Sequence, residues 1–445
     1  MNRFAGRGAL AALGIASAVA YSTSLPIARR PGMEPLAAHV VAFGVLFILY
    51  VVAIRVAFGP AGRARGALGL VLGFGLLFRL LMLPTPIYLS SDVYRYLWDG
   101  RVQLAGVNPY RHPPSAPALA DLRDGETHPG INRPWAPTVY PPAAQWLFAL
   151  AAAVAPNSLT GWRLLLLGLD ALAVILLLRL LRRLGAPDAA VLVYAWSPLV
   201  VFEGVQAGHV DVAVIPLVLL ALGWRRDRSS VAAGVALGLA TLVKLYPAVL
   251  VLAWWRRDDV RFPVAVAGTI ALGYAPYAAS LGLGALGFLP EYFASHEDHN
   301  IGLRALVTFP FGLGGETPRA VAMAALFAVM LAALVTIART RGPEPDGTWK
   351  AAALAAGAYL LLVPTSMHPW YVMWMVPFLA ITLSPGWLYF SGAVTLSYLK
   401  YVVEPAPFPW WVWVAEYVPL SVLLGVTAWR TLGRRPDVSR PLRVT

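Results

Sequence analysis

The sequence contains no cysteine and few charged residues. Only 13% of its 445 residues are charged, whereas 59% are hydrophobic. Without cysteine the chain can form neither a disulfide framework nor a thiolate metal site. A water-soluble domain carries about 25% charged residues, and this chain has too few to cover such a surface. A soluble enzyme, a coiled coil and a disordered chain are therefore excluded.

The hydrophobic residues form runs near membrane length that recur from end to end, with no long polar block between them. The sequence therefore predicts a single all-α polytopic membrane domain over residues 1–445. The first run follows two arginines, as in a signal peptide, but its length and the later runs predict an uncleaved helix. We expect about 12 transmembrane helices, at residues 8–27, 36–57, 66–84, 162–181, 189–204, 210–224, 262–282, 318–338, 350–366, 370–384, 387–402 and 411–429.

The net charge of +13 comes mainly from short arginine clusters between the apolar runs. In a membrane protein such clusters indicate topology rather than nucleic-acid binding. If residues 139–155 form a juxtamembrane helix on the outer surface, most clusters and both termini fall on the cytoplasmic side. We therefore expect a cell (inner) membrane protein with a cytoplasmic tail at 430–445 and no nucleic-acid partner. Arg29 and Arg30, in the first outer loop, depart from this rule.

Residues 230–255 are too few for two crossings, yet arginines at both ends favour the cytoplasm. A re-entrant, broken hairpin satisfies both. Pro247 cannot donate a hydrogen bond to the carbonyl of Val243, so the break is expected at 244–247. Irregular backbone at membrane depth must face protein or a wet cavity, which places Lys244 beside one. Arg79 and Asp170 also lie inside predicted spans, where they either pair or line a cavity.

The largest outer segment, residues 85–138, opens with a predicted amphipathic helix. Ser90 or Ser91 can cap it, and it ends near Gly106. Helical periodicity places Asp92, Arg95, Asp99 and Gln103 on one polar stripe, so the helix should lie along the membrane interface. The acids could favour the helix dipole and pair with Arg95, or Asp92 could act in catalysis. All seven histidines also fall on the outer side under this topology, which favours an external site.

Four segments together resemble a known superfamily. They are "SSDVYRYLWDGRVQLAGVNPY", "PTVYPPAAQWLFAL", "LATLVKLYPAVLVL" and "MHPWYVMWMVPFL". Over roughly residues 85–400 the chain resembles the GT-C membrane glycosyltransferases, closest to the polyprenyl-phosphate-mannose-dependent mannosyltransferases of the GT87 and PIG-M-like type. The resemblance implies a GT-C-like fold with outer juxtamembrane helices and places the catalytic carboxylate at Asp92. Residues 1–65 would be a two-helix addition, and Ser91 replaces the first acid of the pair common in relatives.

The resemblance implies inverting transfer of a sugar, mannose in these relatives, from a polyprenyl-phosphate donor to a lipid or glycan acceptor on the outer face. Asp92 would be the general base, and membrane lipids would surround the site. A cation or imidazole would hold the departing phosphate, with Lys244, Arg304 and His368 as candidates. The remaining expected substrate-binding residues are Arg95, Asp99, Tyr140, His209, Tyr246 and Asn300.

No cofactor or metal is expected, since no nucleotide leaves in such a transfer. Two polar clusters, Gln206/His209/Asp211 and His296–Asn300, could bind a divalent ion, but solvated loops have the same composition more often. A lipid or solute transporter or flippase is an alternative, although transporters usually show two matching halves. A lipid-linked glycan ligase or polymerase is a nearer alternative. The "YPP" and "KLYP" elements favour the transferase.

Overall fold

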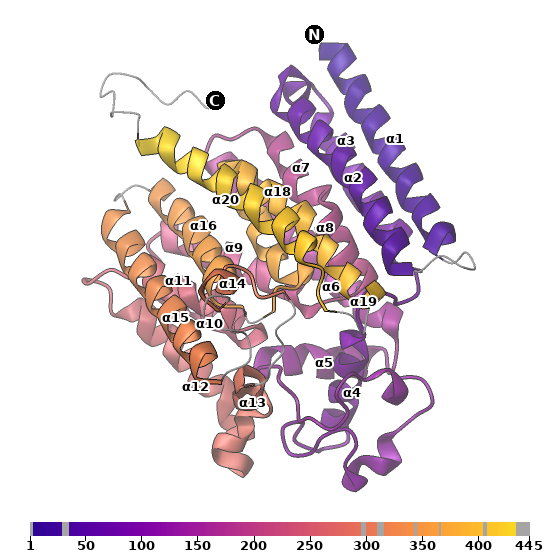
Figure 1. The fold of residues 1–445 in the computed structure, drawn as a ribbon, viewed down its shortest axis with the longest axis vertical. Coiled ribbons are helices and arrows are strands. Elements are labelled where there is room, and N and C mark those ends of the chain that lie inside the picture. Colours follow the sequence, from indigo (N-terminus) through magenta and orange to yellow (C-terminus); the bar gives the residue numbers. More distant parts are fainter. Residues whose placement is uncertain are drawn as a thin grey trace.

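The computed structural model describes residues 3–28, 35–294, 300–308, 316–341, 345–364, 366–403 and 407–432, and these residues contain helices but no strand (Figure 1). The α-helices are α1 Arg3–Ala28, α2 Pro35–Phe58, α3 Ala67–Met82, α4 Asp92–Leu104, α5 Pro142–Val154, α6 Leu159–Arg183, α7 Leu192–Ala195, α8 Pro198–Val201, α9 Val214–Arg226, α10 Ser230–Val243, α11 Val249–Trp254, α12 Arg261–Leu281, α13 Leu289–Ala294, α14 Arg304–Thr308, α15 Glu316–Thr340, α16 Pro345–Leu362, α17 Val376–Thr382, α18 Pro385–Ala393, α19 Leu399–Val403 and α20 Trp410–Leu432.

Shorter helical turns connect several of these helices. They are η1 Pro60–Arg63, η2 Pro117–Leu122, η3 His128–Gly130, η4 Asp188–Val191, the π-helical turn η5 Phe202–Gln206, η6 Val210–Ala213, η7 Tyr246–Ala248, η8 Gly282–Leu286, η10 Pro369–Met375 and η11 Val394–Tyr398.

Five helical segments among the described residues are long and apolar enough to cross a membrane. They are Pro35–Phe58, Leu159–Arg183, Arg261–Ala294, Arg319–Thr340 and Trp410–Arg430. A bent pair of segments, Asp188–Ala195 and Pro198–Gln206, makes a sixth if the pair is one span. The fold is therefore that of an all-helical integral membrane protein, but the expected count of about 12 spans is not confirmed. Several expected spans, among them 66–84 and 370–384, are shorter helices here.

The bend in the sixth segment was not predicted from the sequence, which suggested a straight span over residues 189–204. The two halves meet at 54°, with Pro198 beginning the second half. Helix α7 ends at Ala195, whose carbonyl lies at this break and accepts a hydrogen bond from the guanidinium of Arg79 at 2.6 Å. Arg79 also forms a buried ion pair with Asp170. Of the two alternatives for these residues, the structure therefore shows pairing.

The first two helices pack into the body of the molecule. Helix α1 lies against α2 and α3, and α2 contacts α7, α8, η11 and α19. The hydroxyl of Tyr50 in α2 donates to the carbonyl of Val193 at 2.6 Å, and His39 stacks edge-on with Phe202. Residues from the two ends of the chain thus share one core.

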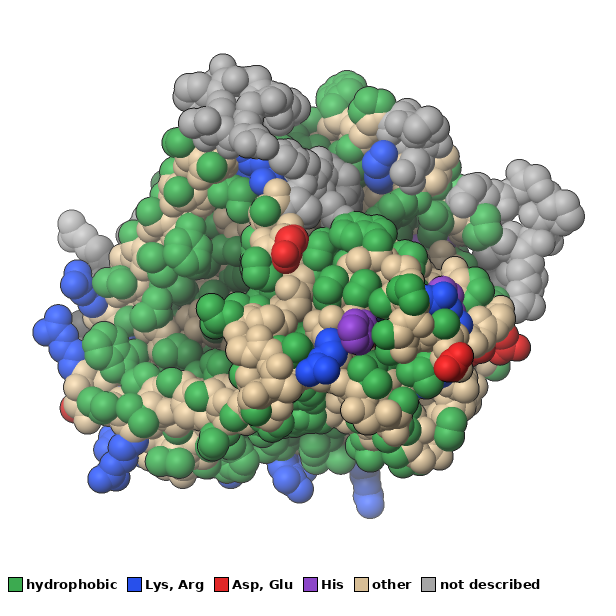
Figure 2. All heavy atoms as spheres, turned by 90° about the horizontal axis from the view of Figure 1, so that it is seen from below, with side chains coloured by type: hydrophobic (Ala, Val, Ile, Leu, Met, Phe, Trp, Pro, Cys, Tyr) green, Lys and Arg blue, Asp and Glu red, His purple; other side chains and the backbone are tan. Residues whose placement is uncertain are grey.

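Helices α4 and α5 lie at one end of the molecule, opposite the start of α1 and the end of α20 (Figure 1). Helix α5 has 13 residues and is about 20 Å long, shorter than the bilayer's hydrocarbon core. Helix α10 ends at Val243, at the expected break, and Lys244 is extended. Seen from below, hydrophobic and uncharged side chains dominate the face at this end, with isolated charged side chains between them (Figure 2).

Candidate active site

Asp92 is the first residue of α4, and its carboxylate is held at the edge of a cavity. The side chain of Ser90 accepts a hydrogen bond from the backbone N–H of Asp92 at 3.3 Å, so Ser90 rather than Ser91 supports the start of the helix. The Asn132 amide donates to one carboxylate oxygen at 2.8 Å, and the Tyr140 hydroxyl donates to the other at 3.3 Å. Burial and the nearby Asp92 raise the pKa of Tyr140 well above its ordinary value. The hydroxyl therefore remains a donor.

The middle of the expected polar stripe of α4, Arg95 and Asp99, is buried. Asp99 is 1% exposed and accepts hydrogen bonds from Arg95 at 2.8 Å and from Thr138 at 2.5 Å. It also accepts one from Gln145 of α5 at 3.0 Å. Arg95 donates further to the carbonyl of Ala136. The stripe thus joins α4 to α5 and to the chain before it, and the expected Arg95–Asp99 ion pair is present.

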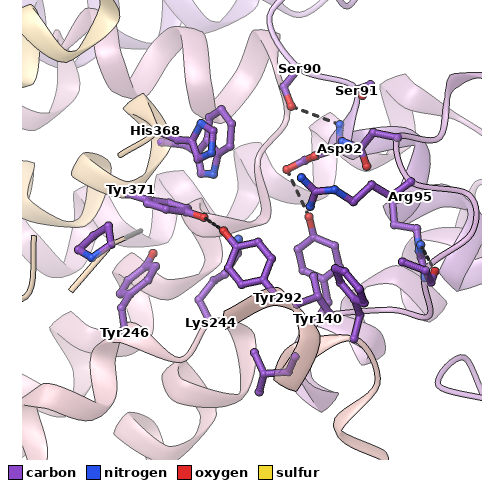
Figure 3. Close-up of a pocket in the computed structure, with 18 of the residues that line it drawn as sticks. Ser90, Ser91, Asp92, Arg95, Tyr140, Lys244, Tyr246, Tyr292, His368 and Tyr371 are labelled. Carbon is purple, nitrogen blue, oxygen red and sulfur yellow. Dashed lines mark hydrogen bonds between the residues drawn. The ribbon is translucent and has the colours of Figure 1, made fainter. Parts of the chain in front are cut away.

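A cavity of about 930 Å³ opens beside Asp92 and is lined by α4, the chain before α5, the break after α10, α13, η10 and the α19 region. We call it the Asp92 cavity. In Figure 3, Asp92, Arg95 and Tyr140 approach it from one side, and Lys244 and Tyr371 from the other. It is lined by Leu36, Leu89, Ser90, Ser91, Asp92, Arg95, Asn132, Arg133, Ala136, Pro137, Val139, Tyr140, Pro141, Lys244, Leu245, Tyr246, Phe288, Leu289, Tyr292, Phe293, Tyr359, Val363, Pro364, His368, Trp370, Tyr371, Tyr398, Lys400, Tyr401, Pro407 and Phe408.

Lys244 enters the cavity because helix α10 ends just before it. Its ammonium lies 3.4 Å from a carboxylate oxygen of Asp211, which is completely buried. The same ammonium lies 5.1 Å from the ring centre of Tyr140 and 5.7 Å from that of Tyr371. Aromatic faces and a carboxylate both favour a cation, and together they offset the cost of removing this one from water.

Trp370 separates the cavity from His209. Its indole stacks on the His209 ring at 4.1 Å between ring centres, and on the His368 ring at 4.3 Å. His368 and Trp370 line the cavity, whereas His209 is 0% exposed. Burial lowers the pKa of His209 to about 3, Asp92 acts in the opposite direction, and Lys244 lowers the pKa further. The His209 imidazole is therefore neutral at physiological pH.

A second buried carboxylate lies on the other side of His209. Nε2 of His209 is 3.4 Å from an oxygen of Glu203, and Nδ1 is 3.9 Å from an oxygen of Asp92. The Tyr398 hydroxyl lies 2.9 and 3.0 Å from the two oxygens of Glu203. The imidazole thus lies between a carboxylate at the cavity and a fully buried one.

Of the ten expected site residues, six line the cavity: Asp92, Arg95, Tyr140, Lys244, Tyr246 and His368. Four do not. Asp99 and His209 are buried behind the cavity wall, where α5 covers Asp99 and Trp370 covers His209. Neither side chain can contact a substrate in this arrangement. Asn300 donates to Glu416 at 2.9 Å and accepts from the backbone of Met367, and Arg304 is buried at the start of α14.

Sequence reasoning did not identify several residues that the fold brings to the site. Glu203 lies inside an apolar run that was interpreted only as a membrane span. A carboxylate within such a run is itself a signal of function. Asn132 and Tyr292 occur in stretches without a recognisable pattern. Asp211 was noted only as part of a polar turn, and its pairing with Lys244 depends on segments 33 residues apart that the sequence does not connect.

The part of the chain with described coordinates contains no group of three or more His, Asp or Glu side chains that could hold a metal ion. The His296–His299 part of the second polar cluster lies outside the described residues. What the cavity offers is a carboxylate that can accept a proton, a cation across from it and aromatic walls. These groups suit the transfer of a polar substrate whose leaving group is an anion.

Comparison with known proteins agrees with this chemistry. A family model described as "Alpha-(1->6)-mannopyranosyltransferase, N-terminal domain", of the MptA/B family, matches residues 4–256. The match covers more than half of the chain and includes α4, α5, His209 and Lys244. No curated protein matches the sequence significantly.

Proposed function

The chain belongs to the α-(1→6)-mannopyranosyltransferase (MptA/B) family, and from this premise we propose that the Asp92 cavity is where mannose is transferred. The protein is a membrane mannosyltransferase, and its family uses a polyprenyl-phosphate-mannose donor. This decides against the transporter alternative. The observation that carries the assignment of the site is the position of the Asp92 carboxylate, at the cavity edge and across from Lys244.

In the proposed reaction an acceptor hydroxyl attacks the anomeric carbon of the donor in a single displacement. Asp92 takes the hydroxyl proton, and its side chain is 17% exposed and so accessible from the cavity. Asn132 and Tyr140 each donate to the carboxylate and fix its orientation. A single displacement inverts the configuration at the anomeric carbon.

Lys244 is proposed to bind the lipid phosphate as it leaves. The charge on the leaving phosphate grows as its bond to the sugar breaks, and an ammonium already in place stabilises that charge without reorganisation. The buried Asp211 and the two tyrosine rings hold this ammonium at the cavity. A monophosphate leaving group stabilised in this way needs no metal ion, so none is part of the proposal.

The active site is proposed to open on the outer side of the membrane, with both termini in the cytoplasm. The positive-inside rule supports this orientation. Helix α20 has the length of a membrane crossing, because its exposed Trp410 and Trp429 are each 76% accessible and 19 residues apart. They are about 28 Å apart along the helix, close to the thickness of the hydrocarbon core, as expected for tryptophans at its two interfaces. Helix α5 would then lie at the outer surface.

Transfer by the purified protein tests the proposed function. The protein is incubated with labelled polyprenyl-phosphate mannose and a lipid extract, and the products are identified by mass spectrometry. We expect a product heavier than its acceptor by one hexose, and expect it to be lost in Asp92→Asn. Transfer by Asp92→Asn at the wild-type rate would contradict the assignment of the site.

A further inference from the structure

His209 is the one imidazole among the described residues that lies between two carboxylates. Neither ring nitrogen makes a hydrogen bond in this state, although both are completely buried. Nε2 is 3.4 Å from Glu203, and Nδ1 is 3.9 Å from Asp92. Buried polar atoms normally have partners, so an arrangement that keeps both nitrogens just beyond hydrogen-bond range requires an explanation.

A neutral imidazole has one N–H and one lone pair, so it can donate to only one of two carboxylates. Glu203 is the nearer one, and the Tyr398 hydroxyl fixes its position. With the N–H on Nε2, the lone pair of Nδ1 faces Asp92. A lone pair repels a carboxylate, which explains why Nδ1 and Asp92 are farther apart than a hydrogen bond allows. Once Asp92 carries a proton, the lone pair of Nδ1 can accept a hydrogen bond from it.

The other groups around His209 are consistent with this assignment. The charge of Lys244 lowers the pKa of His209, and this ammonium is paired with Asp211 rather than with the imidazole. Trp370 covers one ring face and separates His209 from water in the cavity. The backbone N–H of His209 donates to the carbonyl of Glu203 at 2.9 Å, so the imidazole and its buried carboxylate belong to one rigid turn.

We propose that His209 is a positioning residue that acts through Asp92. Asp92 takes the proton of the acceptor hydroxyl and passes it to Nδ1 of His209. At the same time the proton on Nε2 of His209 passes to Glu203. The inference rests on the proposed role of Asp92. The acceptor O–H bond breaks as the oxygen bonds to the anomeric carbon, and the lipid phosphate leaves with the electron pair of the bond it breaks. The relay therefore operates in molecules whose Glu203 is ionised, and the proton ends there, with Asp92 again a carboxylate. After the product leaves, the proton returns by the same path to water in the cavity.

Replacing His209 by alanine and adding small heterocycles tests this role. The His209→Ala enzyme should bind the donor with unchanged KM but lose kcat by a factor on the order of 10 to 10², as expected when an orienting partner is removed. Imidazole should enter the space beside Trp370 and restore turnover. Pyrrole is the matched control, since it has the same ring size and an N–H but no basic nitrogen, and it should not restore turnover.

Glu203→Gln is a second variant, nearly the same size as wild type, that remains informative if His209→Ala does not fold. Its amide can donate to Nε2 and reverse the tautomer, so kcat should fall as in His209→Ala. Wild-type kcat in either folded variant, or equal rescue by imidazole and pyrrole, would show that His209 only fills space. If His209 is shown to fill space only, while Asp92→Asn is inactive in the same assay, the relay is wrong but Asp92 remains the proposed base. If Asp92→Asn is fully active, the proposed base itself is wrong.

Discussion

Two aspartates of α4, seven residues apart, occupy different environments. Asp92 faces the cavity and is held by Asn132 and Tyr140, whereas Asp99 is enclosed by donors from α4, α5 and the chain before α5. A carboxylate with free access can exchange a proton with a substrate, but one whose oxygens are all engaged away from the cavity stabilises its neighbours instead. Asp92 and Asp99 therefore have different roles, although they lie on the same stripe of α4.

Asp92→Asn is expected to reduce kcat by a factor on the order of 10² to 10⁴, because the amide keeps the size of the side chain but cannot accept a proton. The donor KM should change little, since the carboxylate is not proposed to bind the phosphate. Steady-state kinetics with labelled donor checks both values. An unchanged kcat would remove Asp92 from the chemistry.

Asp99→Asn is the matched control on the same helix. It leaves the buried Arg95 without its charged partner, so unfolding should become easier by on the order of 3 kcal/mol. The kcat of the protein that remains folded should stay near wild type. If Asp99→Asn were inactive but as stable as wild type, the catalytic role would have to be reassigned to Asp99.

Lys244→Met is expected to weaken donor binding by about 10- to 100-fold, because a charged hydrogen bond to the phosphate is lost. Lys244→Arg should restore only part of the affinity, since a planar guanidinium differs in shape from an ammonium. Binding of labelled donor to the detergent-purified variants measures the effect.

The double variant Lys244→Met/Asp211→Asn separates phosphate binding from structure. Lys244→Met alone leaves Asp211 buried without its cation, which could disturb the site by itself. The double variant removes both charges. If it binds donor as tightly as wild type, the lysine serves only to neutralise Asp211.

At the scale of single helices, the sequence predicts some breaks and misses others. Pro247 predicts the end of α10 because its missing N–H and its ring act within a few residues along the chain. Pro198 carries the same signal, but at the 54° bend the carbonyl of Ala195 accepts a hydrogen bond from Arg79, which lies more than 100 residues away in the sequence. Local chemistry is visible in a sequence, whereas the partner that makes a break tolerable is not.

An ion pair that the sequence did not reveal holds the segment between α4 and α5 in place. Asp124 forms an ion pair with Arg101 of α4 and accepts hydrogen bonds from the backbone of Thr127 and His128 at 2.7 and 3.0 Å. Arg101 also donates to Asn157, just before α6. Burial opposes ionisation of Asp124, but Arg101 and the backbone donors outweigh it and hold its pKa below the ordinary value.

Asp124→Asn should therefore destabilise the protein by about 1 kcal/mol at neutral pH, a small value because the pair is partly exposed. A lowered pKa in the folded state stabilises the fold above the unfolded pKa near 4 and is lost as the pH falls through the folded value. Thermal unfolding in detergent should thus separate wild type from Asp124→Asn at pH 7 and less so below pH 4. Asp121→Asn, an exposed aspartate of the same segment, should change neither curve.

For the whole molecule, composition was enough to predict an all-helical membrane protein, because nothing else buries so many apolar residues. It was not enough to count the spans. The apolar stretch 370–384, which was expected to be a span, forms the short segments η10 and α17, and residues of η10 line the cavity. Six of the ten expected site residues line the cavity, since motifs mark the segments that meet there. Whether a residue lines the cavity or lies behind its wall depends on packing, which the sequence does not show. Asp99 and His209 were therefore predicted to contact the substrate, although both are buried.

The proposed topology predicts which side of the membrane labels introduced cysteines, and the chain provides a cysteine-free background. Pro156→Cys follows α5 at an exposed position and should react with an impermeant maleimide added to intact cells, as should Glu126→Cys in the outer segment. Arg257→Cys should react only after permeabilisation. Labelling of Pro156→Cys only after permeabilisation would mean that α5 crosses the membrane.

The configuration of the product at the anomeric carbon tests the central claim most directly, because one carboxylate base and a single displacement allow only one outcome. Mannose from a donor of known configuration is transferred by the purified wild-type protein, and the new glycosidic linkage is assigned by NMR before any product can be reprocessed. The account predicts a linkage opposite in configuration to the donor, formed at a rate that falls in Asp92→Asn. A product with the donor's configuration would contradict it, because retention requires a covalent intermediate or a second displacement.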